Sequence, residues 1–261
     1  MPQLPASTPL GFPFVELQSV DSTNKYAMNL VHKGMASHGM AIFAHAQTAG
    51  LGQRGKTWHS ETGKNIALSL IVNPFPIKTF ENFKLSYCVA VSVANFLKKI
   101  VGDEIKIKWP NDIYWRDRKA GGILIENKVK TSEANNSNWQ WAVIGIGLNI
   151  NQTLFSNDLP NPFSLKQITG KDFDVVELAK SLCAEMNTFF NALITDKSSL
   201  LLEQYTSLLY KKDEKVKFKK GLRIFEATIK GVSETGQLIT QHAIEERFDF
   251  GEIEWLLEKT I

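Results

Sequence analysis

The chain has 261 residues, of which 43% are hydrophobic and 22% are charged, a composition typical of a globular protein with one large domain and room for a small second one. Its formal net charge of +3 is too small to indicate by itself a nucleic-acid-binding protein, and a small anionic substrate fits it equally well. There is no apolar run of about 18 residues, no signal-peptide pattern and no metal-type cysteine spacing, so we expect a cytoplasmic protein without membrane contact and with reduced, buried thiols.

The N-terminal half is expected to alternate short strands with two helices. The expected strands, rich in apolar and β-branched residues, are 14–17, 40–44 and 66–72. One helix is expected to begin at Asp21-Ser22-Thr23-Asn24, whose side chains suit an N-cap, and to end at Gly34. A second is expected within residues 80–100, where apolar residues recur every three or four positions.

The second half is expected to continue with three strands, at 105–108, 121–126 and 141–145. The polar residues 131–138 are interpreted as a hairpin tip and 149–170 as a long functional loop. Helices are expected at 175–193 and 198–209, followed by a charged hinge at 211–215 and short β runs to the C-terminus. We expect two domains, residues 1–212 and 213–261.

A glycine-rich stretch, Gly50-Leu51-Gly52-Gln53-Arg54-Gly55-Lys56-Thr57, fits both GxGxxG and GxxxxGK[ST]. Both nucleotide-binding patterns need a helix that begins at the loop, because its N-terminus receives the phosphate. Here the chain continues through turn-rich residues into a strand, so the stretch does not indicate a P-loop or a Rossmann site. The glycines allow backbone amides to approach a ligand closely, and Arg54 and Lys56 add positive charge, which favours a phosphate-contacting loop between two strands.

A second group of polar residues lies beside short apolar runs. Lys108-Trp109-Pro110-Asn111-Asp112 is followed seven residues later by Lys119-Ala120-Gly121-Gly122-Ile123-Leu124-Ile125-Glu126. Packing alone does not call for two lysines, an asparagine and an aspartate here, because buried strands normally exclude charge. The combination indicates a functional site.

Together with Ser22-Thr23-Asn24, the Gln47–Trp58 loop with Ser60 and Asn65, and Gly145-Ile146-Gly147-Leu148-Asn149-Ile150, these motifs follow a specific order and spacing. In this respect the chain resembles the biotin protein ligases from about residue 14 to residue 150. Gly231, Gly236 and Gly251-Glu252-Ile253 resemble that family's small C-terminal domain. Because few residues precede the first strand, the chain is similar to the short class that lacks an N-terminal DNA-binding domain, and we expect no DNA binding.

The resemblance implies an α+β fold, with a mixed β-sheet catalytic domain of the class II synthetase and biotin/lipoate ligase type, helices packed on one face, and a small SH3-like β barrel after it. It implies that biotin and ATP, with Mg²⁺, form biotinyl-5′-AMP, and that biotin then passes to a lysine of a biotin carboxyl carrier domain. Such a reaction needs its reactants held together and their charge neutralised. Whether the protein is a monomer or a homodimer is left open.

The resemblance also implies roles for individual residues. Lys119 would bridge the biotin carboxylate and the α-phosphate, with Arg54 as a second catalytic residue. The residues expected to contact biotin are Ser22, Thr23, Asn24, Gln47, Gly50, Leu51, Gly52, Gln53, Lys119, Gly121 and Gly122. Those expected to contact ATP are Arg54, Lys56, Trp58, Lys108, Asn111, Lys119 and Asn149, and either Asn111 or Asp112 would contact Mg²⁺.

Several of these residues also have a purely structural interpretation. Ser22-Thr23-Asn24 can cap a helix, Trp58 and Trp109 can belong to the core, and Gly145 and Gly147 can serve close backbone packing. Asp112 can serve only to orient its neighbours. Lys119, outside its motif, would be read as a surface lysine in a turn.

Three further expectations remain. The family usually has Arg at the position of Leu51, so the chain is expected to hold the adenylate less tightly if that guanidinium contacts it. The loops at 50–64 and after Asn149 are expected to close over the adenylate. Two rival functions stay open: a lipoate or octanoate ligase of the same superfamily, and a non-catalytic nucleotide- or nucleic-acid-binding module with Trp58 as a stacking platform.

Overall fold

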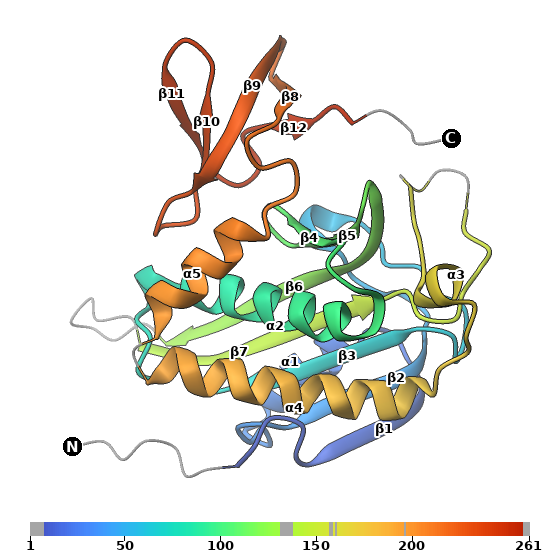
Figure 1. The fold of residues 1–261 in the computed structure, drawn as a ribbon. Helices are drawn as coiled ribbons and strands as arrows, with labels where there is room; N and C mark the ends of the chain where they lie inside the picture. Colours follow the sequence, from blue (N-terminus) through green and yellow to red (C-terminus); the bar gives the residue numbers. More distant parts are fainter. Residues whose placement is uncertain (1–7, 131–137, 157–158, 160, 196, 258–261) are drawn as a thin grey trace.

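The computed structural model describes residues 8–130, 138–156, 159, 161–195 and 197–257 (Figure 1). In this part of the chain a seven-stranded sheet carries helices on both faces, and a separate five-stranded sheet follows near the C-terminus. None of the described helices has the length and apolar character needed to cross a membrane.

The large sheet has the strand order β1-β2-β3-β7-β6-β5-β4. Its strands are β1 (Phe14–Val20), β2 (Ala41–Gln47), β3 (Ile66–Val72), β4 (Ile105–Lys108), β5 (Asp112–Trp115), β6 (Arg118–Lys130) and β7 (Asn138–Leu148). Only β1 and β2 pair in parallel, joined by the crossover helix α1 (Thr23–His32), and the other neighbours are antiparallel. The mixed sheet predicted from the sequence is therefore confirmed.

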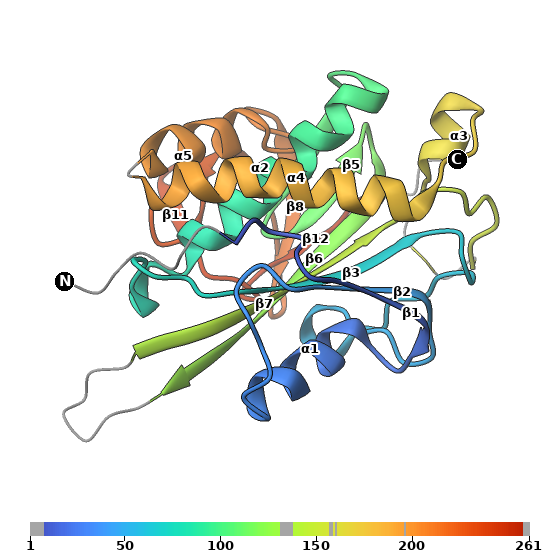
Figure 2. The ribbon, with the colours of Figure 1, turned by 90° about the horizontal axis from the view of Figure 1, so that it is seen from below.

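Helices cover both faces of this sheet. The helices α2 (Phe83–Val101), α4 (Val175–Ile194) and α5 (Ser198–Ser207) lie on one face, while α1 lies on the other (Figure 2). The face under α1 buries Ala27 and Val31 against Ile42, Ile71 and Val143. The expectation that helices pack on one face only was wrong, because α1 is itself amphipathic and buries its apolar side on the sheet.

The C-terminal sheet is antiparallel, with the order β11-β10-β9-β8-β12. Its strands are β8 (Lys215–Lys220), β9 (Arg223–Val232), β10 (Leu238–Gln241), β11 (Glu245–Phe248) and β12 (Glu254–Trp255). The expected β content after the charged hinge is confirmed. The SH3-like closure and the division into domains 1–212 and 213–261 stay predictions.

One strand of the large sheet, β5, was not expected. The strand β5 continues directly from the Lys108–Asp112 motif, whose turn joins β4 to β5 and so places Asp112 at a strand end. The flanking strands β6 and β7 are longer than predicted and pair as far as Lys130 and Asn138; the predicted hairpin tip, apart from Asn138, lies outside the described residues.

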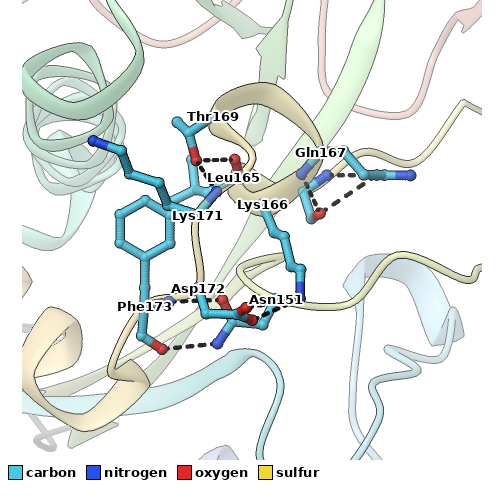
Figure 3. Close-up of polar contacts among 9 residues, drawn as sticks. Asn151, Leu165, Lys166, Gln167, Thr169, Lys171, Asp172 and Phe173 are labelled. Carbon is cyan, nitrogen blue, oxygen red and sulfur yellow. Dashed lines mark hydrogen bonds and ion pairs between the residues drawn. The ribbon is translucent and has the colours of Figure 1, made fainter.

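The expected loop after Asn149 contains a short helix, α3 (Leu165–Thr169). Its capping box is formed by Ser164, whose hydroxyl accepts from the Gln167 amide, and by Gln167, whose side chain accepts from the Ser164 amide. Nearby, the Asn151 side chain both donates to and accepts from the Phe173 backbone, and Lys166 pairs with Asp172 (Figure 3). These contacts fasten the segment to the start of α4. Short 3₁₀ turns occur at Gln53–Gly55 and Thr79–Glu81.

Candidate active site

A line of small residues crosses the α1 face of the large sheet. Register pairs Ala67 of β3 with Gly147 of β7, Gly147 with Gly122 of β6, and Gly122 with Asp112 of β5. Directly paired residues share a face, so these four side-chain positions form one row, here called the glycine row. With strands about 4.8 Å apart, the row is about 14 Å long. The glycines at its centre let other groups approach the backbone of the sheet closely.

The catalytic lysine expected from the sequence lies at one end of the glycine row. Lys119 Nζ is 2.7 Å from Asp112 Oδ1, and both side chains are about a quarter exposed. A Cβ at Gly122 would lie 3.6 Å from Lys119 Nζ and 3.5 Å from Asp112 Oδ1, so the pair stands over this glycine. Asp112 therefore orients Lys119, one of the two roles that the sequence left open for it.

The Ser-Thr-Asn motif lies near the other end, at the start of α1. Ser22, Thr23 and Asn24 are almost fully buried. Ser22 is the N-cap residue by backbone geometry, but its side chain makes no capping hydrogen bond. The Thr23 amide donates to Gln47 Oε1 at 2.9 Å and its hydroxyl lies 3.1 Å from the same atom. The motif is thus turned towards Gln47 and the sheet rather than towards the helix end.

Two residues that the sequence reasoning missed complete this end. Ser69, on β3, lies 2.8 Å from Thr23 Oγ1 and 2.6 Å from Asn24 Oδ1. Glu126, on β6, accepts from Asn24 Nδ2 at 2.8 Å. A signal for Ser69 did exist, because it is the single polar residue in a strand whose seven residues are all buried. Glu126 directly ends the Gly-Gly-Ile-Leu-Ile run but resembles an ordinary strand-end carboxylate.

The motif glycines on β7 are explained by their neighbours. A Cβ at Gly145 would collide with the Asn24 amide, and one at Gly147 would lie 2.6 Å from the Trp58 ring. Because these positions have no side chain, Asn24 and Trp58 can pack directly against the backbone of β7. Gly121, by contrast, lies on the opposite face, where a Cβ would collide with Leu148.

The glycine-rich loop lies over the row. Leu51 and Thr57 form an isolated antiparallel bridge, and between them the only helical geometry is a three-residue 3₁₀ turn, which agrees with the expectation that this is not a P-loop. Gly50 must be small because a Cβ there would lie 2.5 Å from the Trp58 carbonyl oxygen. Within the described residues, Gln53 Oε1 and Trp58 Nε1 are buried without a hydrogen-bond partner. The same holds for Thr240 Oγ1 and Trp255 Nε1 in the C-terminal sheet, but the two atoms of the loop are the ones beside the glycine row, where a ligand could supply the missing partners.

The lysine of the Lys108–Asp112 motif lies in a partly apolar setting. Lys108 Nζ is 5.6 Å from the centre of the Tyr114 ring and 5.2 Å from that of Trp255. Burial lowers the pKa of Lys108, Asp112 opposes this shift, and the nearby charges of Lys119 and Lys56 add to it. Three lysines therefore face one region, which favours an anionic ligand.

Asn111 and Asn149 are each held by backbone. Asn111 Nδ2 donates to the Ile123 carbonyl at 2.7 Å, and Asn149 Nδ2 donates to the Lys119 carbonyl at 3.4 Å. The two asparagines thereby flank the strand that carries Lys119. Asn65 is a structural residue, because its side chain pairs with Gln152 and with the Ile150 amide.

The C-terminal sheet borders the site. Trp109 is buried, its Nε1 donates to the Gly236 carbonyl at 2.9 Å, and its ring packs edge-to-face on Phe250. Arg54 is exposed and lies 5.8 Å from the centre of the Phe250 ring. A cavity of about 290 Å³ separates the two sheets here, lined among others by Gln53, Asn111 and Phe250. A second hollow, of about 540 Å³, lies beside β4 and the end of α5. It is lined by both acidic and basic side chains, and none of the predicted site residues is among them.

No cluster of three or more His, Cys, Asp or Glu side chains capable of holding a metal occurs in the described part of the chain. Cys88 and Cys183 are buried and free, as expected, and burial raises the pKa of each thiol to about 12. They are therefore not thiolates at neutral pH.

Comparison with known proteins places these motifs in a family. Residues 16–149 match the model of the biotin/lipoate A/B protein ligase family. The bifunctional ligase/repressor BirA of Escherichia coli is 34% identical over 173 residues, which are 65% of this chain and 51% of that protein. The BirA of Salmonella typhimurium is 30% identical over 228 residues, which are 86% of this chain and 68% of that protein. The chain thus spans about half the length of the first of these curated relatives.

Solved structures share the fold. The biotin protein ligase from Aquifex aeolicus in complex with biotin and ATP aligns with a TM-score of 0.75 at 24% identity, covering 92% of this chain and 97% of that one. The Leishmania major biotin protein ligase in complex with biotinyl-5-AMP aligns with a TM-score of 0.63 at 23% identity, covering 90% and 98%. Both similarities extend over the large sheet and the C-terminal part.

Proposed function

The chain belongs to the biotin/lipoate A/B protein ligase family, and from this premise we propose that it is a biotin protein ligase. It would activate biotin with ATP to biotinyl-5′-AMP and transfer the biotin to a lysine of a carrier domain. The observation that carries the proposal is the glycine row, with an ion-paired lysine at one end and a buried set of hydrogen-bonding side chains near the other. An acid with a polar ring and an apolar tail matches this arrangement.

The proposed chemistry follows from the two ends. Thr23 and Gln47 would hold the ring of biotin, and its tail would lie along the glycine row with the carboxylate near Lys119. A carboxylate oxygen then attacks the α-phosphorus of ATP, the bond to the bridging oxygen breaks, and pyrophosphate leaves. Lys119 would offset the charge where the two anions meet, a contribution that is largest in a water-poor site. Asp112 keeps its ammonium group in place.

The other cations would serve the phosphates. Lys108 and Lys56 lie close enough for their charges to interact, and Arg54 of the glycine-rich loop lies against Phe250 of the C-terminal part. Asn111 and Asn149, fixed by backbone on either side of the Lys119 strand, would complete the nucleotide contacts. In the second step the acceptor amine attacks the anhydride carbonyl, AMP leaves, and the amine loses its proton.

Mg²⁺ would enter this site together with ATP. It takes oxygen ligands and is usually held by one or two carboxylates plus substrate phosphates rather than by a protein cage. The Asn111 side-chain oxygen and the Asp112 carboxylate fit that pattern, since Nδ2 of Asn111 is already fixed on the Ile123 carbonyl. The metal would neutralise phosphate charge.

Two finer statements belong to the same proposal. The partner would be a biotin carboxyl carrier domain presenting its acceptor lysine, and the protein would work in the cytoplasm. The lipoate or octanoate alternative is less favoured, because the polar lining that Thr23 and Gln47 provide at this end suits a polar ring better than an apolar ring or chain.

The test is exchange of labelled pyrophosphate into ATP, measured separately with biotin, lipoate and octanoate. Exchange that depends on biotin alone is the expected result, because it isolates the first step without an acceptor. Exchange with lipoate or octanoate instead would move the assignment to the sister activity. Absence of exchange with all three acids, combined with nucleotide or nucleic-acid binding that weakens steeply with salt, would favour the non-catalytic alternative.

A further inference from the structure

The strand β6 contains one extra residue beside the proposed catalytic lysine. Ile113 of β5 pairs with Gly121 of β6. The next residue along β5, Tyr114, pairs with Lys119, so Ala120 opposes no residue of β5. This two-against-one arrangement is a β-bulge, which bends its strand and changes the direction in which nearby side chains point.

The bulge decides on which face of the sheet Lys119 lies. Side chains alternate along a strand, so a regular β6 would place Lys119 with Gly121, on the face opposite the glycine row. The extra residue reverses the alternation, and Lys119 shares the face of Gly122 and Asp112 instead. The distance of 2.7 Å between Lys119 Nζ and Asp112 Oδ1 agrees with this orientation. A single inserted residue therefore turns the lysine towards the glycine row.

The backbone of Lys119 is held by a segment that follows β7 in the chain. Its N–H donates to the Asn161 carbonyl at 2.7 Å, and its carbonyl accepts from the Phe163 N–H at 2.8 Å. Pro162 forms an isolated parallel bridge with Lys119. Residues 161–163, here called the clamp segment, thus continue the sheet beyond the point where β6 and β7 cease to pair. These bonds fix the lysine backbone directly beside the bulge.

Aromatic and guanidinium groups on the opposite face hold the clamp segment against β5 and β6. The Phe163 ring stacks on that of Trp115, with 5.2 Å between the ring centres and 14° between the planes. The Arg118 guanidinium lies 3.9 Å from the centre of the Phe163 ring, and its Nη2 donates to the Pro162 carbonyl at 3.2 Å. A planar guanidinium can stack and donate at the same time, so Arg118 and Phe163 together secure the segment.

Building on the proposed function, we propose that Phe163 and Arg118 are positioning residues of the activation step. They hold the clamp segment on β6, and the clamp segment holds the bulge that turns Lys119 towards the glycine row. Both act through Lys119 rather than on biotin, because Arg118 pairs with Trp115 on the face opposite the row. A displacement of about 1 Å at a reacting centre can reduce a rate by about a hundredfold.

Phe163→Leu tests the proposal, because it removes the stacked ring and keeps the backbone of the clamp segment. We expect formation of biotinyl-AMP, measured with enzyme in excess over biotin, to slow by about tenfold to a hundredfold. The Kd of biotin should stay within about threefold, since the ring end of the site is unchanged. Phe163→Tyr retains the ring and should keep a rate near that of the wild type. Arg118→Lys retains the charge without the planar group and should slow the reaction.

A double-mutant comparison separates positioning from a general loosening of the structure. If Phe163 acts through Lys119, then Phe163→Leu should slow the reaction by less than about twofold in a Lys119→Ala background. A purely structural role would slow it equally in both backgrounds. Hydrogen exchange gives a second reading that needs no activity. The Lys119 amide should exchange faster in Phe163→Leu, because that amide donates to the clamp segment.

Phe225→Leu is the matched control. Phe225 likewise packs on another aromatic ring and has an arginine, Arg223, 4.5 Å from its ring centre, but it lies in the C-terminal sheet. Thermal unfolding checks that each variant folds. An unchanged rate in Phe163→Leu, or equal slowing in both backgrounds, would overturn the inference and leave the proposed function intact. Absence of adenylate formation by the wild type would instead contradict the proposed function, and exchange of the Lys119 amide would still test the clamp segment.

Discussion

Lys119 is the side chain on which the proposed activation step depends most. Replacing it with Ala should lower biotin-dependent pyrophosphate exchange by about a hundredfold or more, because charge stabilisation in a preorganised site is lost. The free energy of unfolding should fall by less than about 1 kcal/mol, since its pair with Asp112 is partly exposed. Exchange assays and thermal unfolding on the same preparation measure both. Near-normal exchange in Lys119→Ala would contradict the assignment.

Leu51 stands where the family usually has Arg, and it is half-buried beside its bridge partner Thr57. A guanidinium placed here would lie in the loop that covers the glycine row, so Leu51→Arg should slow the release of biotinyl-AMP. Release can be followed by rapid filtration after adenylate formation. Leu222→Arg serves as the control, because Leu222 is fully exposed in the turn between β8 and β9. An unchanged release rate in Leu51→Arg would contradict a role for this position in holding the adenylate.

The sequence predicted most of the residues that meet around the glycine row, because motif spacing identifies them. Lys119 with Asp112, and Thr23 with Gln47, are brought together as the motifs imply. Ser69 was not predicted as a site residue, because one small polar residue in an apolar strand produces no spacing pattern. Its contact with Asn24 appears only when β3 is placed against α1. The same holds for the contact of Glu126 with Asn24, which lie 102 positions apart.

The strand β7 has two glycines whose replacement should act differently. Gly145→Ala forces the buried Asn24 side chain to move and should cost about 1–3 kcal/mol of unfolding free energy, as overpacking usually does. Gly147→Ala meets Trp58, which sits in a half-buried loop that can shift, so biotin affinity should fall with a smaller loss of stability. Denaturant unfolding and calorimetry separate the effects. Gly231→Ala is the control, because a Cβ there meets only Thr206 at 3.5 Å. Equal stability losses in all three variants would contradict this account.

Among the elements, those with strong periodicity were predicted well and those defined by tertiary contact were not. The helix α4 and the strand β3 were placed to within a residue, since each has a long apolar pattern. The strand β5 was missed because the sequence of the Lys108–Asp112 motif is typical of a turn. Asp112, the last residue of the motif, is the first residue of β5 because it pairs with both β4 and β6. The short helix α3 depends on a Ser164–Gln167 capping box that could have been recognised.

The large sheet and the C-terminal sheet meet around Lys108, which makes nucleotide binding sensitive to pH. Burial lowers the pKa of this lysine below the 10.5 of the free side chain, so its charge is lost at a lower pH on the alkaline side. The KM for ATP should therefore rise as pH increases through that lowered pKa. In Lys108→Arg the rise should be absent or shifted upward, because a guanidinium stays charged. Identical profiles for the two proteins would contradict a phosphate-binding Lys108.

The charge of Lys108 is expected to have opposite effects on ATP binding and on stability: it favours binding but lowers the free energy of unfolding. A lowered pKa means that the protonated amine is less favourable in the folded chain than in the unfolded one, so below that pKa its charge reduces stability and the cost disappears as pH rises. Lys108→Met should therefore not lower the free energy of unfolding at neutral pH. It should nevertheless weaken ATP binding.

Trp255 connects the C-terminal sheet to nucleotide binding, because its ring forms one wall beside the Lys108 ammonium and Tyr114 forms another. Trp255→Leu removes the cation–π contact and should raise the KM for ATP by about threefold to thirtyfold, while the KM for biotin stays constant because the Ser-Thr-Asn motif lies near the other end of the site. Trp255→Phe should be intermediate. Phe225→Leu is the control, since Phe225 packs on Phe218 in the same sheet, whereas Lys108 lies over the rings of Tyr114 and Trp255. If both KM values rise together in Trp255→Leu, and Phe225→Leu behaves alike, the C-terminal sheet supports the fold as a whole rather than the nucleotide site through Lys108.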